Sequence, residues 1–255
     1  MLVQSRPHHL RKNMTTQVTV RIVDGALRIA HIEPSPVFPL RLDYQGGFST
    51  MVDYLSAYVP LVPPCNLNYD DWTRKESLAY LAWFVEQVPI RAKYIVDFVA
   101  QATREPYLYA MSSHDKLVSI WRWFLQVAET EPVSQEEREA QAPFLAKFGP
   151  RFVCYTRFTL MTEYIMRDIG MLFAQLLLDI SGQLDWTVVS KPRKYVWVNR
   201  PILDGFLDTN YTPAYKAQID PLHMVGVQAS KIINGTLATE TDLATIFNRW
   251  AAKIP

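Results

Sequence analysis

The chain has 255 residues and a formal net charge of +1, and 49% of its residues are hydrophobic, so it can bury a sizeable core. A nearly neutral protein lacks the field that would draw it to nucleic acid or to an anionic membrane. Two isolated cysteines, Cys65 and Cys154, form neither a disulfide framework nor a zinc-binding motif. We therefore expect a globular, cytoplasmic protein with reduced thiols.

The first residues predict a flexible leader. Residues 1–14 are mostly polar and basic and lack the apolar stretch of a signal peptide, and Met14 is an alternative start. The longest apolar stretch, residues 171–180, is interrupted by polar side chains and is too short to span a membrane. The remaining residues, 15–255, are predicted to form a single domain.

Residues 17–33 predict an N-terminal β-hairpin. Apolar residues alternate with polar ones on both sides of the two-residue turn Asp24-Gly25. In this register Arg21 lies opposite Arg28, and like charges in that position repel each other. Two interpretations stay open: both arginines are solvated, or both await an acidic partner.

A helical core is predicted over residues 73–180. The segments Thr73–Glu76 and Ser134–Glu137 have the form of capping boxes, which mark helix starts. Pro89 either kinks the first helix or opens the next one. The predicted helices cover residues 73–88, 90–103, 115–130, 135–147 and 152–180.

The last part of the chain, residues 185–255, predicts a mixture of strands and helices. Strands rich in Trp, Val and Tyr are expected at residues 185–190 and 194–198. The predicted fold is α+β and predominantly α-helical, with a bundle-like helical core, the N-terminal hairpin and a small β element near residues 185–198. The remaining segments are a loop at 201–221, an ambiguous strand or helix at 222–233, and a closing helix at 241–253.

Asp168 lies inside the apolar stripe of the longest predicted helix. A carboxylate in that position must be paired or hydrogen-bonded, because an unpaired buried charge is strongly unfavourable. It is either a structural group that binds a loop amide or a basic side chain, or a functional residue at the floor of a groove. Gly170 disfavours the helix by roughly 1 kcal/mol relative to alanine, which indicates that another backbone approaches the helix there.

The segment Lys191–Arg200 interleaves basic and aromatic residues. If its second half is a strand, Tyr195, Trp197 and Asn199 share one face. Together with Arg193 and Lys194, these side chains suggest a solvated basic hairpin, a surface for a protein partner or, as a third interpretation, a site for single-stranded nucleic acid.

Trp123 departs from the buried stripe of its predicted helix. Leu117, Ile120, Trp121 and Phe124 share one helical face, whereas Trp123 points elsewhere. A tryptophan beside Arg122 is a common anchor at an interface. Trp123 is therefore a candidate partner-binding residue, with burial under another helix as the alternative.

We recognise no catalytic, metal-binding or cofactor motif. His31, His114 and His223 lie in unrelated segments without the spacing of metal ligands. A phosphate-binding loop, a dinucleotide fingerprint, a nucleophile elbow and a kinase signature are all lacking. We expect no metal and no cofactor, although residues that meet only in space can still form a catalytic site.

Several short runs between about residues 72 and 206 form a recognisable pattern: Tyr80–Phe84, Pro89, Asp168–Met171, Trp186, Lys191-Pro192, Pro201–Leu203 and Gly205-Phe206. This pattern resembles a largely uncharacterised family of helical, cytosolic bacterial proteins, some of which look like immunity proteins that neutralise a toxin. The resemblance supplies no catalytic residues.

Three functional hypotheses follow. The first is a non-catalytic immunity protein that binds a cognate toxin through Trp123, Tyr195 and Trp197, with Arg21, Arg28, Arg193 and Lys194 facing an acidic patch. The second is an enzyme centred on Asp168, together with Lys191, Arg200 or a histidine. The third is a nucleic-acid-binding accessory protein that uses residues 191–200.

Overall fold

The computed structural model describes residues 20–23, 26–29, 54–148, 155–192 and 195–255. The chain divides into two compact units, Met1–Gly47 and Phe48–Pro255. The predicted leader, and Met14 within it, lie outside the described residues. The prediction of one domain over residues 15–255 stays a prediction.

The first unit contains the predicted hairpin. Strand β1 (Val20–Val23) pairs antiparallel with β2 (Ala26–Ile29). Arg21 is opposite Arg28 in the register, as the alternation of apolar residues predicts. The side chains of both arginines lie outside what the structure describes, so their solvation or pairing stays a prediction.

Helix α2 (Arg74–Thr103) begins the second unit and runs without interruption through Pro89. The predicted capping box is present: the side chain of Thr73 accepts from the Glu76 amide, and that of Glu76 accepts from the Thr73 amide. The prediction of two separate helices is wrong. Pro89 is exposed, and the buried residues on both sides of it keep the helix against the core.

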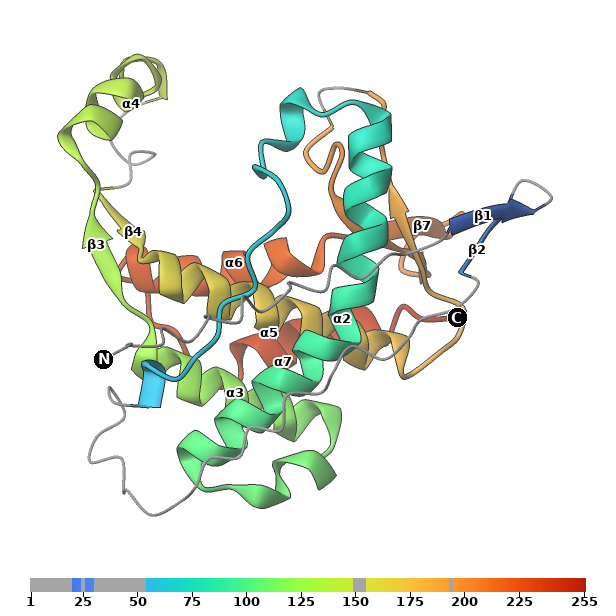
Figure 1. Cartoon of the computed structure of the whole chain (residues 1–255), viewed down its shortest axis with the longest axis horizontal. Coiled ribbons are helices and arrows are strands. Elements are labelled where there is room, and N and C mark those ends of the chain that lie inside the picture. Colours follow the sequence, from blue (N-terminus) through green and yellow to red (C-terminus); the bar gives the residue numbers. More distant parts are fainter. Residues whose placement is uncertain (1–19, 24–25, 30–53, 149–154, 193–194) are drawn as a thin grey trace, which may run out of the picture. The chain divides into compact units, whose positions relative to one another are not determined.

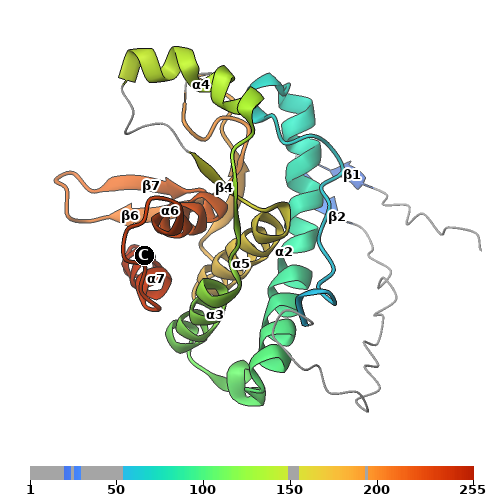
Figure 2. The same cartoon turned by 90° about the vertical axis from the view of Figure 1, so that its left-hand side faces the viewer.

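Helix α5 (Leu160–Leu178) lies at the centre of the second unit, between α2 and α6 (Pro221–Ile233) (Figures 1 and 2). It starts later than predicted because β4 (Thr156–Phe158) pairs with β3 (Thr130–Pro132), after which Thr159 caps the helix. The other helical elements are α3 (Ser113–Val127), α4 (Gln135–Phe148), α7 (Asp242–Ala251), and the 3₁₀ turns η1 (Tyr69–Asp71) and η2 (Pro106–Ala110).

The segment predicted to be a loop, residues 201–221, forms two strands of a three-stranded antiparallel sheet. Its order is β5 (Asp185–Val188), β6 (Pro201–Asp208) and β7 (Tyr215–Ile219). Pro201 starts β6, where its missing N–H is tolerated, and Gly205 at φ +108° accompanies a shift in the register. Because proline and glycine are typical of loops, these two residues make the strand difficult to predict from the sequence.

The second predicted strand, residues 194–198, is also wrong. From Tyr195 onward the chain turns, and Val198 forms only an isolated parallel bridge to Val189. The observed fold is nevertheless α+β and mainly helical, as predicted. Within the described residues, no helix has the length and apolar character needed to cross a bilayer.

Candidate functional site

Asp168 is fully buried and forms an ion pair with Arg91 of α2. The Arg91 Nε donates to Asp168 Oδ1 at 2.9 Å, and a terminal guanidinium nitrogen donates to Oδ2, so the pair is bidentate. The hydroxyl of Tyr58 also donates to Oδ2. Burial raises the pKa of Asp168, whereas the guanidinium and the phenol stabilise its ionised form.

The same arginine holds the segment that precedes the helical core. Its guanidinium donates to the Val59 carbonyl at 2.9 Å and lies 4.1 Å from the ring centroid of Tyr94. The Val59 amide in turn donates to the Tyr94 hydroxyl at 2.7 Å. Asp168 therefore joins α5 to α2 and to the segment around Tyr58. This agrees with the interpretation of Asp168 as a structural residue that binds a basic side chain.

Gly170 lies where a second backbone comes close, as predicted. A Cβ at this position would be 3.0 Å from the Cα of Leu222 in α6. The missing side chain lets α5 and α6 approach each other, and this contact fixes the first turn of α6.

Trp123 is buried, with 2% of its surface exposed, so the prediction of an exposed interface anchor is wrong. Its ring packs edge-to-face against Phe98 of α2, with 5.8 Å between the centroids. Helix α3 is therefore covered on both sides, and Trp123 belongs to the core. Trp121 is buried on the predicted stripe.

The segment after β5 brings aromatic side chains to the surface, but not as a strand. Tyr195 and Trp197 are partly exposed and make an edge-to-face contact with 5.8 Å between ring centroids. Asn199, which was predicted to share their face, is instead buried at φ +60° and donates to the carbonyls of Tyr69 and Trp72. Arg193 and Lys194 lie outside the described residues.

Two further aromatic residues lie on the β6–β7 hairpin, which projects beyond the helices in Figure 2. Tyr211 and Tyr215 are 62% and 63% exposed, and their ring centroids are 6.3 Å apart. Burial raises the pKa of Tyr195, and the electrostatic influence of Tyr215 and Asp204 raises it further. The sequence missed both hairpin tyrosines because the segment was predicted to be a loop.

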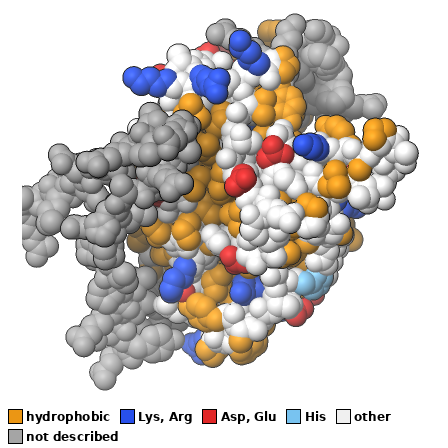
Figure 3. Space-filling view, turned by 90° about the vertical axis from the view of Figure 1, so that its right-hand side faces the viewer, with side chains coloured by type: hydrophobic (Ala, Val, Ile, Leu, Met, Phe, Trp, Pro, Cys, Tyr) orange, Lys and Arg blue, Asp and Glu red, His pale blue; other side chains and the backbone are white. Residues whose placement is uncertain are grey.

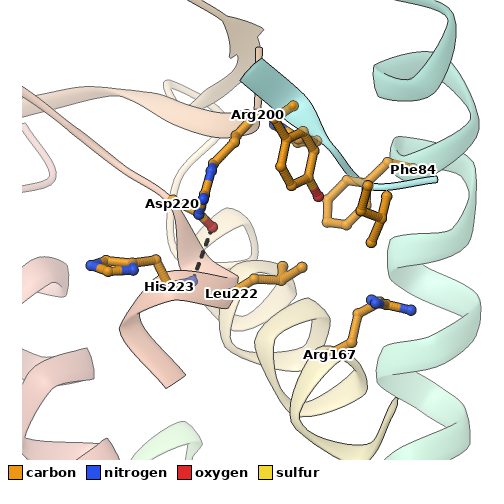
Figure 4. Close-up of a pocket in the computed structure, with 9 residues that line it drawn as sticks. Phe84, Arg167, Arg200, Asp220, Leu222 and His223 are labelled. Carbon is orange, nitrogen blue, oxygen red and sulfur yellow. Dashed lines mark hydrogen bonds and ion pairs between the residues drawn. The ribbon is translucent and has the colours of Figure 1, made fainter. Parts of the chain in front are cut away.

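A cavity of about 200 Å³ lies between α2, α5 and the first turn of α6 (Figure 4). Arg167 of α5 lines the cavity, and so does Arg200, the residue that precedes β6. Apolar and aromatic side chains form the rest of its wall, and they include Tyr69, Phe84 and Leu222.

Asp220 is the carboxylate of this cavity and caps helix α6. Its Oδ1 accepts from the His223 amide at 3.0 Å, and its Oδ2 pairs with Arg200 at 3.3 Å. Burial raises the pKa of Asp220, partly offset by the His223 amide and Arg200. The Arg200 guanidinium also lies 5.1 Å from the ring centroid of Tyr69, while Arg167 donates to the Leu61 carbonyl at 3.3 Å.

The two histidines that the structure describes, His114 and His223, have different surroundings. The Nδ1 of His114 lies 2.9 Å from the Nδ2 of Asn248, His223 lines the cavity, and His31 is outside the described residues. Over the part of the chain that the structure describes, no three His, Cys, Asp or Glu side chains gather around a common point.

No protein-family model matches the chain, and comparisons with curated proteins and with solved structures found no match either.

Proposed function

We propose that this is a non-catalytic binding protein, which docks a protein partner on an aromatic surface formed by Tyr195, Trp197, Tyr211 and Tyr215. The exposure of the two hairpin tyrosines is the observation that carries this proposal. Tyrosine and tryptophan are enriched where proteins bind each other, because they combine a large apolar area with a polar tip.

The sequence of the segment that contains Tyr195 and Trp197 is basic, and an acidic partner would complement it. Residues 191–200 contain Lys191, Arg193, Lys194 and Arg200 and no acidic residue. Lys191 and Lys216, whose side chains the structure describes, are both exposed. Positive groups at the rim of an interface steer an oppositely charged partner and raise the association rate. Figure 3 shows one face of the molecule, on which hydrophobic side chains gather in groups with both basic and acidic side chains beside them.

An immunity role would make that partner a cognate toxin inside a bacterial cell. This part of the proposal rests on the sequence resemblance and on the basic aromatic segment. Trp123 is not one of the proposed binding residues, because its side chain is buried. Arg21 and Arg28 stay candidates for the contact with an acidic patch.

An enzyme centred on Asp168 is less well supported. The carboxylate is sealed from solvent and fully engaged by Arg91 and Tyr58, so a substrate has no access to it in this conformation. Lys191 is exposed, and Arg200 faces a cavity that Asp168 does not line.

The test begins with isolation of the partner from the native host by a tagged pull-down, followed by calorimetry on the purified pair. The double substitution Tyr211→Ala/Tyr215→Ala should weaken binding roughly tenfold or more, as expected for aromatic residues at the centre of an interface. Tyr107→Ala is the matched control, because Tyr107 is 57% exposed on η2. Equal affinity of the double variant and the wild type would contradict the proposed surface.

A further inference from the structure

The cavity beside the first turn of α6 contains more positive than negative charge. Arg167 and Arg200 both line it, whereas Asp220 is the one acidic residue in its wall. Among the described residues, Arg167 has no carboxylate within ion-pair distance. The adjacent Asp168 is bound by Arg91.

Most of the donors on the two guanidinium groups are free for a ligand. Arg167 uses one nitrogen for the Leu61 carbonyl, and Arg200 uses one for Asp220, both at a long distance of 3.3 Å. Each guanidinium has five N–H donors in a planar fork, which suits an anion with two or more oxygens. Each guanidinium also lies near an aromatic ring: Arg167 is 5.5 Å from the ring centroid of Tyr164, and Arg200 is 5.1 Å from that of Tyr69.

Asp220 does not block this use of the cavity. Its two oxygens are already engaged, one by the His223 amide and the other by Arg200, and its side chain is 6% exposed. It can offset no more than one of the two positive charges. It also holds the guanidinium of Arg200, which lies against the Asp220 carboxylate in Figure 4.

The surroundings strengthen the attraction for an anion. The ring of Phe84 and the side chain of Leu222 line the wall, and an apolar wall raises the strength of a charge–charge interaction relative to water.

From this arrangement we infer that the cavity is a binding site for a small oxyanion, the phosphate or carboxylate group of a low-molecular-weight ligand, attracted by the positive charge of Arg167 and Arg200 in its wall. The cavity volume of about 200 Å³ suits one such group with a short attached body. This site is independent of the protein partner, although the ring of Trp197 lies 6.5 Å from that of His223 at the cavity wall.

The experiment uses the full chain in a chloride buffer, with inorganic phosphate and acetate as separate probes. Phenylglyoxal modifies accessible arginines, and mass spectrometry of the peptides reports the rate at each position. We expect one of the two probes to slow modification of Arg167 and Arg200 several-fold, while Arg122, exposed and paired with Glu240, reacts at an unchanged rate. Protection by phosphate alone identifies a phosphate ligand, and protection by acetate alone identifies a carboxylate ligand.

Calorimetry on variants supplies the second measurement. Arg167→Gln should weaken binding of the protecting probe roughly tenfold or more, because it removes a charge-assisted pair of hydrogen bonds. Arg122→Gln is the matched control and should bind as the wild type does. If Arg167→Gln fails to fold, the protection pattern of the wild type still decides. Equal reaction rates with and without both probes, or protection of Arg122 to the same degree, would overturn the site.

Discussion

At the scale of single residues, the pair of Arg91 and Asp168 sets the strongest expectation for stability. Both side chains are buried, with 7% and 0% of their residue surfaces exposed. Removing one member of such a pair leaves the other charge in a low dielectric without compensation. Arg91→Met and Asp168→Leu should therefore each lower the free energy of unfolding by about 3–5 kcal/mol, measured by urea denaturation.

The double variant Arg91→Met/Asp168→Leu separates the charge from the shape of the site. With both charges gone, the cost of burying them disappears, so the double variant should be more stable than either single one. Arg122→Met is the control on the surface, where Arg122 and Glu240 are about half exposed, and it should change stability by less than about 1 kcal/mol. Additive losses in the double variant would show that the two residues do not act as a pair.

The need for a partner at Asp168 follows from the sequence, but the identity of that partner does not. An acidic residue inside an apolar helical stripe is visible in the periodicity, and burial then requires compensation. Arg91 is 77 residues away along the chain and Tyr58 is 110 away. Nothing local links these positions, because they meet only when α2 packs on α5. The burial of Trp123, which the sequence offered only as an alternative, likewise depends on another helix, because Phe98 of α2 packs against its ring.

At the scale of elements, the contact between α5 and α6 depends on Gly170. Alanine favours a helix over glycine by about 1 kcal/mol, but its Cβ would lie 3.0 Å from the backbone of Leu222, which cannot move like the end of a side chain. Overpacking of this kind typically destabilises by about 1–3 kcal/mol. Gly170→Ala should therefore lower the melting temperature, measured by circular dichroism.

Gly226→Ala is the matched control, because it makes the same exchange in α6. The nearest atom to a Cβ at position 226 is the terminal methyl of Met166 at 3.9 Å, an ordinary contact with a flexible group. Here the gain in helix propensity should prevail, and stability should rise by up to about 1 kcal/mol. If both variants shift in the same direction, close packing of α5 on α6 is not what requires glycine at position 170.

Helices were easier to predict than strands for a physical reason. Caps such as Thr73 with Glu76 and the helical period are local signals, and both appear in the structure. Strand β6 begins with proline and contains Gly205, so its local composition resembles a loop, and only pairing with β5 and β7 makes it a strand. The cavity was equally difficult to predict from the sequence, because Arg167 and Arg200 line the same cavity only in the folded chain.

At the scale of the whole molecule, the chain divides near Gly47 into two compact units. The second unit contains hydrophobic clusters built from helices α2, α3, α5, α6 and α7 and the three-stranded sheet. Apolar burial is the main source of folding free energy, so this second unit should contain what it needs to fold.

A chain that begins at Phe48 tests this division. We expect it to keep the helical signal of the full chain in far-ultraviolet circular dichroism and to melt within a few degrees of it, a shift of less than about 1 kcal/mol for a protein of this size. The full chain with Arg21→Ala and Arg28→Ala serves as the companion variant, because it retains the first unit and removes the two arginines that lie opposite each other in the hairpin. A truncated chain that melts far below the full one would mean that residues 1–47 complete the core. A truncated chain that is equally stable but binds the partner more weakly, together with the same loss in the companion variant, would assign Arg21 and Arg28 to the interface.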